Sequence, residues 1–582
     1  MYVVGISSLK QNTAAALLHD GMVEAAIEND KLLRHHSRGL PKAALRFCVE
    51  KTGIEWKDVD TIAVATRPMS AWARRTLLRG RLSATSPTAS AYYEAREIAA
   101  LARTLNDIRI LRRNNDGSTS KVVTLDHHLC HAAHGFFSSS FDRALIVTMD
   151  EDGDGVAATV SLGEGDQIRV LKRIAFPHSL GWVYSQVTEL LGFVPRQDEH
   201  KVQWLSLEGE PAYQDVFLKM LRRTGSPVPH IDSSYFRRGL TGQVAFSAKF
   251  YKEAQVPDRK PEFTDEQRRA LAASVQAACL HIVADLVRHY MTSQKVQHVC
   301  FSGGLFLNSL LVSDLEKQFG VGQVSVPPAP GNAGAAVGAA LLVWHQSKKP
   351  RTGGLVHAYV GPKFRHQDIK EVLDNCKSRY SLQNTEVRKL GAAVQLLQAG
   401  KIIGWYQGAT EFGPRALGNR SVLASPWAAY VKENLNDYIK HREWFRPFAL
   451  AVPEEDCERY FDASPLCRYM NSLGTVKDGC DVLPEGMMLP GRRVRVQVVE
   501  RKNNPLFWAL LKKFGEQAPA PLLLNTSFNL FGEPLVVQPR DAIRSYFCSG
   551  VDALVIDNFV LSKSGQASIR TEIATVPLRM GA

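Results

Sequence analysis

Strand-like and helix-like hydrophobic patterns alternate along the whole chain, and this alternation limits the possible folds most strongly. Residues 1–8 and 22–28 are predicted strands around the turn HDG at 19–21, and residues 61–68 form a further predicted strand. Residues 70–120 have a helical, basic pattern. The chain has 582 residues, which is more than one hydrophobic core can organise. We therefore expect an α/β protein of about two to four domains.

The segment QSKKPRTGG, residues 346–354, is the clearest break in this alternation. It is polar, basic and marked by Gly and Pro, and the α/β pattern resumes after it. We therefore predict a first domain at 1–345, a linker at 346–354 and a second domain at 355–582.

The net charge is +13, from 71 basic and 58 acidic residues. A basic surface can serve solubility alone, or it can bind nucleic acids or small anions. The basic residues are spread along the chain, and no Lys/Arg tract alternates with aromatic residues. A nucleic-acid partner is therefore disfavoured.

The expected location is the cytoplasm. The start MYVVGISS has no basic segment ahead of its apolar run, and the longest apolar tract, AGAAVGAALLVW, is too short to cross a bilayer. The nine cysteines form no CxxC pair, which favours a reducing compartment and argues against a metal or disulfide framework built on sulfur. We expect no membrane association.

The run HHLCHAAH starts at His127 and places His131 four residues later. On a helix these side chains share one face, which is the spacing that two imidazoles need to bind one metal ion. The same pair can also be a packing or surface feature.

The run TMDEDGDG contains Asp150, Asp152 and Asp154 and resembles the start of a calcium loop. The twelfth position is Ser161 rather than Glu, and the residues after the turn are strand-like, so a calcium loop is rejected. The run predicts a hairpin whose tip carries Asp150 towards a metal or phosphate, with ordinary turn chemistry as the alternative.

Two Gly-rich turns each join a predicted strand to a predicted helix. In FSGGLFLN, Gly303 and Gly304 would let the backbone approach a phosphate, and the N-terminus of the following helix would favour an anion. In PAPGNAGAAVGAA, Asn332 stands near a helix start. A plain tight turn and a helix cap are the respective alternatives.

The stretch EFGPRALGNRS, residues 411–421, places Arg415 and Arg420 in a loop rich in Gly, Pro and Asn. Two permanent cations in a loop whose backbone can approach a ligand closely make this loop a candidate ligand site. Alternatively, the arginines brace the loop through carbonyls and carboxylates.

Together these motifs resemble known families. The strand, DG turn and strand at the start, the Asp/Gly hairpin and the GG loop are similar to the actin-like ATPase fold. With the histidine pair added, residues 1–345 resemble its metal-bearing, Kae1-like branch, found in tRNA threonylcarbamoyl-transfer proteins. EFGPRALGNRS, IKHREWFRPFAL, LLLNTSFNLFGEPLV and EHKVQWLSLEGE resemble the NodU/CmcH/TobZ family of O-carbamoyltransferases over nearly the whole chain.

The resemblance implies two active sites. A C-terminal YrdC-like domain would join carbamoyl phosphate and ATP, with Mg²⁺, into carbamoyl-adenylate. The N-terminal domain would pass the carbamoyl group to a hydroxyl or amine of a small metabolite in natural-product or antibiotic biosynthesis, beside a metal that is commonly iron, with zinc or manganese as alternatives. A homo-oligomer is compatible with this prediction.

The family motifs also imply site residues. The implied catalytic cations are Arg415, Lys440, Arg446 and Arg495. The implied substrate- and nucleotide-binding residues are Arg420, Arg442, Asn525, Ser527, Asn529, Gly303, Gly304 and Asn308. The implied metal ligands are His127, His131, Asp150 and Asn332.

The chain departs from the family at three places. Asn332 stands where the family has an Asp ligand, and Gln11-Asn12 stands where the family has a His-Asp pair. In LPGRRVRVQ, only Arg495 and Gln497 match the corresponding segment of the family. Asn332 adds no charge to a metal site, and Gln11 cannot act as a base. The alternatives are therefore a carbamoyl-adenylate-forming or non-catalytic partner protein with a degenerate transfer site and, with less support, a tRNA-modifying enzyme.

Overall fold

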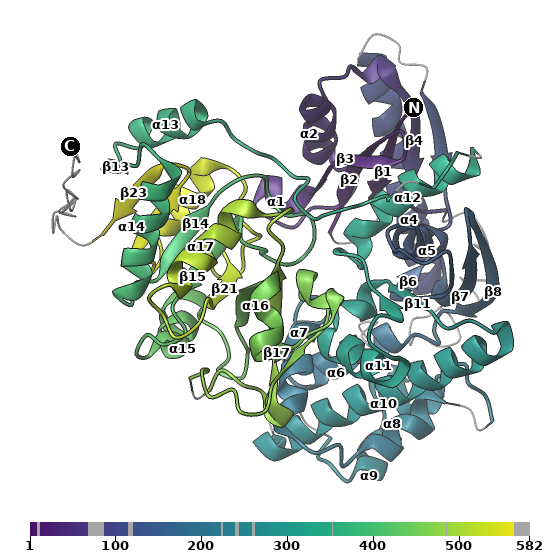
Figure 1. Cartoon of the computed structure of the whole chain (residues 1–582). Coiled ribbons are helices and arrows are strands. Elements are labelled where there is room, and N and C mark those ends of the chain that lie inside the picture. The colour runs from purple at the N-terminus through teal and green to yellow at the C-terminus, as the bar shows by residue number, and fades with distance from the viewer. Residues whose placement is uncertain are drawn as a thin grey trace, which may run out of the picture.

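The computed structural model describes residues 1–8, 12–67, 87–114, 120–222, 225–238, 244–258, 262–347, 349–351, 353–484 and 486–563. Two bodies lie side by side in Figure 1. The body on the right ends with α12 (Asn332–Gln346), and the body on the left begins with α13 (His366–Asn375).

The N-terminal body contains two five-stranded sheets with the same topology. In each, an antiparallel meander is extended by two parallel strands, in the orders β3-β2-β1-β4-β5 and β8-β7-β6-β11-β12. This repeat is the actin-like arrangement, so the predicted N-terminal fold is confirmed. The strands are β1 (Tyr2–Ser7), β2 (Ala14–His19), β3 (Met22–Glu28), β4 (Val59–Val64), β5 (Lys121–Thr124), β6 (Arg143–Gly153), β7 (Val156–Glu164), β8 (Gln167–Ala175), β11 (Val299–Ser302) and β12 (Val324–Ser325).

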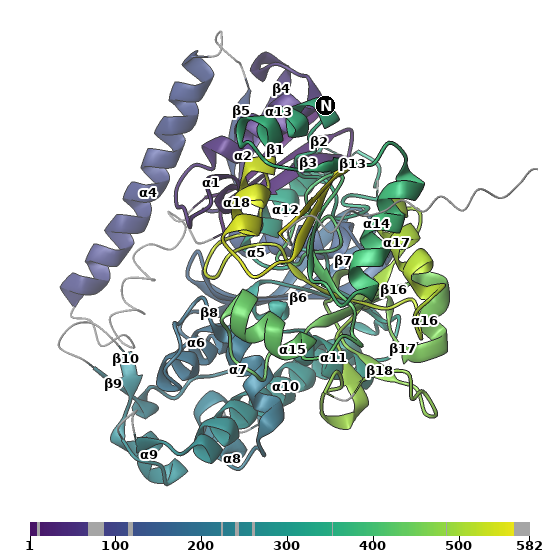
Figure 2. The ribbon, with the colours of Figure 1, turned by 90° about the vertical axis from the view of Figure 1, so that its left-hand side faces the viewer.

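Helices cover both faces of each sheet. α5 (His127–Phe137) and α12 lie between the sheets and share one core with both. α2 (Lys42–Thr52) and α4 (Pro87–Asn114) pack on the outer face of the first sheet, and Figure 2 shows α4 as a long rod on this flank. The outer face of the second sheet is covered by α6 (Leu180–Leu190), α7 (Glu199–Leu205), α8 (Gln214–Leu221), α10 (Asp265–Gln294) and α11 (Ser309–Phe319). The smaller elements are α1 (Asn29–Leu33), α9 (Ala248–Ala254) and the hairpin of β9 (Phe236–Arg238) and β10 (Val244–Phe246).

The small residues of α12 allow backbones to touch at the centre of this body. A Cβ atom on Gly5 of β1 would lie 1.9 Å from the carbonyl oxygen of Ala336 in α12. A Cβ atom on Gly338 of α12 would lie 1.8 Å from the carbonyl oxygen of Cys130 in α5. The run AGAAVGAA therefore fixes α12 against both β1 and α5.

An eight-stranded mixed sheet, in the order β13-β23-β22-β14-β15-β21-β16-β20, is the centre of the C-terminal body. α14 (Glu386–Gln398) and α17 (Pro505–Gly515) cover one face, and α13 and α18 (Pro539–Phe547) cover the other. This arrangement confirms the predicted YrdC-like α/β domain. The other elements of this body are β13 (Ser381–Leu382), β14 (Ile403–Tyr406), β15 (Arg420–Ala424), α15 (Val431–Glu433), β16 (Ala449–Pro453), α16 (Glu454–Tyr460), β17 (Phe461–Asp462), β18 (Gly474–Val476), β19 (Arg493–Val494), β20 (Val496–Val499), β21 (Leu523–Ser527), β22 (Ala553–Ile556) and β23 (Phe559–Ser562). The strands β17, β18 and β19 form a separate three-stranded sheet.

The chain stays attached to the first sheet after α12. The backbone N–H of Val23 donates to the carbonyl of Gly354, and that of Ala26 donates to the carbonyl of Val360, both at 3.2 Å. Residues 354–360 therefore follow the edge strand β3 before the chain enters the second body. The boundaries of the two domains and of the linker stay predictions.

The first predicted hairpin needs a correction. The turn at 19–21 connects β2 to β3, and β1 pairs with β2 on its other side. The strand β2, sequence AAALLH, was missed because it is buried almost throughout and so lacks the alternation of a half-buried strand. In the predicted helical segment 70–120, α4 covers 87–114, and residues 70–86 and 115–119 lie outside the described residues.

Among the described residues, α10 is the helix that is long and apolar enough to cross a membrane. Its most apolar window is 78% buried inside the protein, as in a core helix.

Candidate active site

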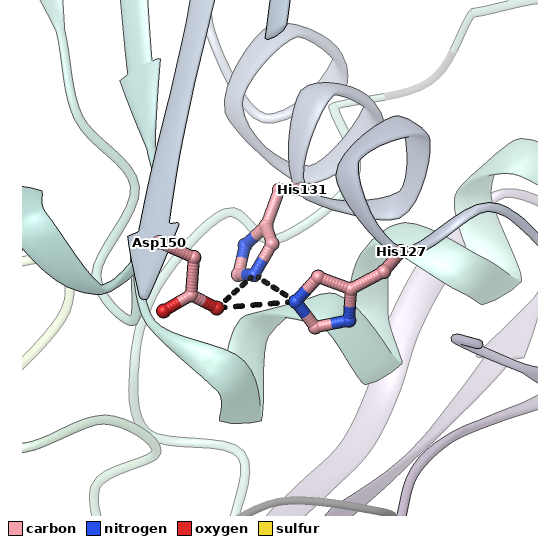
Figure 3. A group of neighbouring side chains, drawn as sticks. All are labelled: His127, His131 and Asp150. Atoms are coloured by element: carbon pink, nitrogen blue, oxygen red, sulfur yellow. Dashed lines mark hydrogen bonds and ion pairs between the residues drawn. The ribbon is translucent and has the colours of Figure 1, made fainter. Parts of the chain in front are cut away.

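His127 and His131 lie one turn apart on α5, and Asp150 of β6 faces both (Figure 3). The Nε2 atom of His127 is 3.1 Å from the Oδ2 atom of Asp150 and 3.1 Å from the Nε2 atom of His131. His131 Nε2 is 3.6 Å from Asp150 Oδ2. All three side chains are buried, so their ligand atoms converge on one enclosed point.

The two neighbouring aspartates shape this site from outside. Asp154 accepts the backbone N–H of His127 at 3.0 Å and the hydroxyl of Thr66 at 2.8 Å. Asp152 accepts the backbone N–H of Gly155 at 2.9 Å, within the hairpin turn. Asp154 thus helps to fix where α5 begins relative to the end of β6.

The chemistry of the three donors fits a divalent metal ion. His127 Nδ1 lies 3.2 Å from the carbonyl oxygen of Ala65, so Nδ1 carries the proton and Nε2 presents a lone pair. His131 Nδ1 lies 3.4 Å from Ser302 Oγ, whose own hydroxyl donates to a carbonyl, so the same assignment follows. Two lone pairs and a carboxylate oxygen this close repel one another unless a cation lies among them. Ligand atoms 2.0–2.1 Å from one metal ion are about 3.0–3.4 Å apart.

The Gly-Gly loop packs directly against Asp150. Gly303 has a φ of +105°, and a Cβ atom there would lie 2.1 Å from the carbonyl oxygen of Met149. A Cβ atom on Gly304 would lie 2.9 Å from Asp150 Oδ1. Glycine is therefore needed for the approach of this loop to the carboxylate, and contact with a phosphate stays a prediction.

The two asparagines at helix starts differ. Asn308 accepts the backbone N–H of Leu311 at 2.9 Å as the N-cap of α11, and its amide donates to Gln276 at 2.7 Å. Asn332 is the first residue of α12, and Gly331 occupies the cap position. Asn332 therefore does not serve as the cap, and its role as a metal ligand stays a prediction.

Five cations converge where the two bodies meet: Arg415, Lys440, Arg442, Arg446 and Arg495. Burial lowers the pKa of all five side chains. After burial, the charge of Arg446 helps to lower the pKa of Arg415 to about 10 and that of Arg442 to about 9. Burial and then Arg415, Arg442 and Arg446 also lower the pKa of Arg495. The cations therefore repel one another inside the protein.

These cations have too few acceptors. Four buried nitrogens lack a hydrogen-bond partner among the described residues: Arg415 Nε, Arg442 Nη2, Arg446 Nε and Arg495 Nε. Glu443 pairs with Arg446 at 3.6 Å, but it also pairs with Lys201 at 2.7 Å. Buried N–H groups without acceptors are costly in an empty protein and favourable around an anion. The group is therefore a candidate anion-binding site.

The predicted residues of β21 and its following loop lie beside Lys440. Lys440 Nζ donates to the carbonyl of Ser527 and to Asn529 Oδ1, the latter at 2.8 Å. The Ser527 hydroxyl also donates to Asn529 Oδ1 at 2.9 Å. Lys440, Ser527 and Asn529 thus form one hydrogen-bonded unit.

Asn525 offers an acceptor of fixed orientation. Its amide nitrogen donates to Gln497 at 2.6 Å and to the carbonyl of Ala416 at 3.2 Å, while Gln497 donates to the carbonyl of Leu417 at 2.8 Å. The Asn525 Oδ1 atom is buried and has no donor among the described residues. It can accept a hydrogen bond from a ligand amino group next to the loop of Arg415.

Arg420 differs from the five cations in the partners of its terminal nitrogens, although its Nε atom also lacks a hydrogen-bond partner among the described residues. Its side chain is fully buried, donates to the carbonyls of Gln407 at 2.5 Å and Gly408 at 3.1 Å, and stacks on the ring of Tyr406 at 3.7 Å. These contacts agree with the bracing alternative. Direct contact of Arg420 with a ligand stays a prediction.

The helix α7 of the N-terminal body reaches the cation group, and its residues were missed as site residues. Trp204 lies with its ring 5.8 Å from the Arg495 guanidinium. His200 hydrogen-bonds through Nδ1 to the carbonyl of Gln197 at 3.0 Å; burial, then Arg446 and Arg415, lower its pKa to about 3. The available signal was EHKVQWLSLEGE, but this motif does not indicate that α7 faces the other body.

The two candidate sites adjoin. Arg415 Nη2 donates to the carbonyl of Leu307 at 3.2 Å. Leu307 closes the short 3-10 segment Gly304–Leu307, whose first residue contacts Asp150. One turn of backbone therefore links the anion site to the metal triad. The predicted change at Gln11 lies outside the described residues.

Comparisons with known proteins match both bodies to one family. The family described as "Carbamoyltransferase N-terminus" matches residues 2–341, and "Carbamoyltransferase C-terminus" matches residues 394–563. An uncharacterized protein of Synechocystis sp., sll1178, is 32% identical over 97% of each chain. Nodulation protein NolNO of Sinorhizobium fredii is 30% identical over 94% of this chain and 78% of its own. The 3'-hydroxymethylcephem-O-carbamoyltransferase of Amycolatopsis lactamdurans is 29% identical over 72% of this chain and 79% of its own.

Proposed function

This chain belongs to the carbamoyltransferase family and is a transferase enzyme, and we propose that it activates carbamoyl phosphate with ATP and passes the carbamoyl group to a small metabolite. In the first half-reaction, carbamoyl phosphate, ATP and water give carbamoyl-adenylate, phosphate and pyrophosphate. In the second, a hydroxyl oxygen of the acceptor bonds to the carbamoyl carbon and AMP leaves. The name of the cephem relative supports a hydroxyl acceptor in natural-product biosynthesis.

The five-cation group carries this proposal, because its buried N–H groups need several anionic oxygens. Carbamoyl phosphate and ATP, with Mg²⁺, bring phosphates to one site, and fixed guanidinium groups stabilise the charge that develops during adenylyl transfer. Asn525 Oδ1 and neutral His200 supply acceptors, which the amino group of a carbamoyl ligand needs and which arginine cannot provide.

The triad of His127, His131 and Asp150 serves the transfer step in this proposal. A divalent metal bound there supplies Lewis-acid chemistry towards an oxygen atom, with iron, zinc or manganese as candidates. The imidazoles are fixed by Ala65 and Ser302, so they present lone pairs without rotating. The contact between Arg415 and Leu307 places this site beside the anion site, so the activated carbamoyl group has a short path.

The test is a coupled assay with the purified full-length chain. We expect pyrophosphate release that requires both carbamoyl phosphate and ATP. We also expect mass spectrometry to detect a carbamoylated product within a panel of hydroxylated and amino-bearing metabolites. No pyrophosphate release with both substrates present would refute the first half-reaction. Pyrophosphate release without transfer to any acceptor would favour a protein that makes carbamoyl-adenylate for a partner.

We further propose that the enzyme works in the cytoplasm. All nine cysteines are free, and seven are at least partly buried, as expected where thiols stay reduced. Fractionation of the producing cells tests this location.

A further inference from the structure

The short helix α1 of the N-terminal body contacts two loops of the anion site. Figure 1 shows α1 at the junction of the two bodies. Its residues Asn29, Asp30 and Lys31 are polar and buried, which is unusual for a five-residue helix next to a sheet edge. Buried polar residues of this kind need defined partners.

Lys31 and Glu28 clamp the loop that leads to Arg415. Lys31 Nζ donates to the carbonyls of Glu411 at 2.8 Å and Gly413 at 2.7 Å, and it pairs with Glu28 at 2.9 Å. Lys31 thus makes two hydrogen bonds to this loop and one ion pair within its own body. Glu28 Oε1 accepts the backbone N–H of Gly413 at 2.8 Å. Both polar backbone groups of Gly413, two residues before Arg415, are therefore held by the N-terminal body.

The clamped loop is rigid beyond Gly413. Glu411 Oε1 accepts the backbone N–H groups of Leu417 and Asn419, both at 2.8 Å. Gly413 has a φ of +112°, and a Cβ atom there would lie 2.8 Å from the carbonyl oxygen of Pro328. The position of Arg415 therefore depends on how α1 holds this loop.

Arg34, directly after α1, holds the second loop. Its Nη1 donates to the carbonyls of Pro534 and Leu535, both at 2.6 Å, and its Nη2 pairs with Glu533 at 2.8 Å. The carbonyl of Glu533 accepts the amide N–H of Asn529, the partner of Lys440. The contacts of Arg34 thus lead to the cation Lys440.

The other end of α1 is bound to its own sheet. Asn29 N–H donates to the carbonyl of Thr13 at 2.8 Å, and Asn29 also accepts the backbone N–H of Ala43 at 3.1 Å. Asp30 accepts the N–H of Ser37 at 2.8 Å. A change at α1 is therefore transmitted to the loops of the C-terminal body rather than absorbed by movement of α1.

We propose that Lys31 and Arg34 are positioning residues of the anion site, which set the places of Arg415 and Lys440 from the opposite body. This inference rests on the proposed function for the identity of the ligands. It predicts that the C-terminal body binds phosphate groups well only while α1 holds both loops. A misplacement of about 1 Å can lower a rate by about 100-fold, so loss of one clamp has a measurable effect.

The experiment compares Lys31→Met with Lys51→Met in the full chain. Lys51 is a matched control, because it also donates from the N-terminal body to two carbonyls, those of Glu24 at 2.7 Å and Val360 at 2.8 Å, but not to either loop. Pyrophosphate binding is measured by calorimetry, and pyrophosphate release is measured with both substrates. We expect Lys31→Met to weaken binding and raise KM by about 10- to 100-fold, while Lys51→Met resembles wild type in both.

A double variant separates positioning from loss of structure. If Lys31 acts through Arg415, adding Lys31→Met to Arg415→Ala should cost little more than Arg415→Ala alone. Full additivity, or wild-type pyrophosphate affinity in folded Lys31→Met, would overturn the proposal. If Lys31→Met does not fold, pyrophosphate binding is measured for Arg34→Met instead. Weakened binding in that variant supports the positioning role, and wild-type affinity overturns it.

The outcomes also separate this proposal from the proposed function. A wild-type chain that binds pyrophosphate but releases none from the two substrates refutes the proposed reaction, and the binding comparison still decides the role of α1. A wild-type chain that does not bind pyrophosphate refutes the positioning role.

Discussion

The buried cations of the domain junction fall into two groups that differ in their partners. Lys31 donates to two backbone carbonyls and forms an ion pair with Glu28. Both terminal nitrogens of Arg34 have oxygen partners, and its Nε makes no hydrogen bond within the described part of the chain but lies 4.0 Å from Asp541. Arg446 and Arg495, in the cation group of the same junction, each leave a buried N–H group without an acceptor among the described residues. The two groups differ in their neighbours: Lys31 and Arg34 lie beside carboxylates, whereas Arg495 lies beside other arginines.

This difference separates cations that stabilise the folded protein from cations that are available to bind a ligand. A cation that lies beside carboxylates and carbonyls contributes to the folded state, because removing it leaves those buried acceptors unpaired. A cation with missing acceptors and like-charged neighbours destabilises the ligand-free protein and gains its partners only when an anion binds. Substitutions in the two groups should therefore have opposite effects on stability.

The largest expected effect is the loss of adenylate formation in Arg446→Ala. The pyrophosphate-release rate should fall by at least about 100-fold, corresponding to about 3 kcal/mol of transition-state stabilisation. Arg365→Ala is the control, because Arg365 is 84% exposed in the same body, and its rate should match wild type. A near-normal rate in Arg446→Ala would remove this residue from the site.

The second expected effect separates the two half-reactions. His131→Ala should leave pyrophosphate release within about twofold of wild type and should stop transfer to the acceptor, because His131 belongs to the triad and not to the cation group. His281→Ala, at an exposed histidine, is the control and should transfer normally. If His131→Ala is folded yet releases no pyrophosphate, the division of labour between the bodies is wrong.

The contrast between the cation groups is tested directly by two matched substitutions. Arg34→Met should destabilise the ligand-free protein by about 1–3 kcal/mol, because Glu533 Oε2 and two carbonyls lose their donor, while Glu533 Oε1 keeps Arg544. Arg495→Met should leave stability unchanged or raise it by about 1 kcal/mol, because a repelled charge is replaced by an apolar chain. Chemical denaturation of both variants gives the change in the free energy of unfolding. Equal losses in the two variants would show that the two groups of cations do not differ in their effect on stability.

A smaller effect concerns the metal triad. Wild-type protein should purify with less than one metal ion per chain, and Asn332→Asp should raise the occupancy, because a carboxylate adds charge and a stronger oxygen ligand. Elemental analysis of both proteins, prepared side by side, gives the answer. Full occupancy in wild type would show that a neutral fourth residue suffices, and no metal in either protein after reconstitution would point to a degenerate site.

The last expected effect is a dependence of stability on pH, which is small near neutral pH. Burial, then Arg446 and Arg415, lower the pKa of His200 to about 3, whereas an unfolded histidine titrates near 6.5. Between these values the unfolded chain binds a proton that the folded chain does not, so stability is lost as the pH falls below about 6.5, by up to about 1.4 kcal/mol per pH unit. The free energy of unfolding of His200→Gln should fall less over this pH range, as measured by denaturation curves. An identical pH dependence in both proteins would contradict a neutral His200 in the folded state.

Sequence motifs predicted candidate residues for each site, but they did not predict which segments from the two bodies lie next to one another. His127, His131 and Asp150 were predictable because helical spacing and a strand end are local properties. The α/β halves followed from the alternation of patterns. The roles of α1 and α7 were not predictable, because Lys31 contacts residues about 380 positions away and no local pattern specifies such a contact. Arg420 and Arg415 share one motif, and only their tertiary partners distinguish a brace from a candidate ligand-binding group.

The repeated sheet order gives the N-terminal body an internal pseudo-symmetry. α5 follows the last strand of the first sheet, and α12 follows the last strand of the second, so the two helices are equivalent elements of the two halves. His127 opens α5 and Asn332 opens α12, which makes them symmetry-related positions. The departure at Asn332 therefore falls on one half of a symmetric pair, while its counterpart His127 keeps a metal-binding side chain. Asp150 on β6 belongs to the second half and both histidines belong to α5, so a rotation of one half against the other would move Asp150 relative to the histidines without separating the histidines from each other.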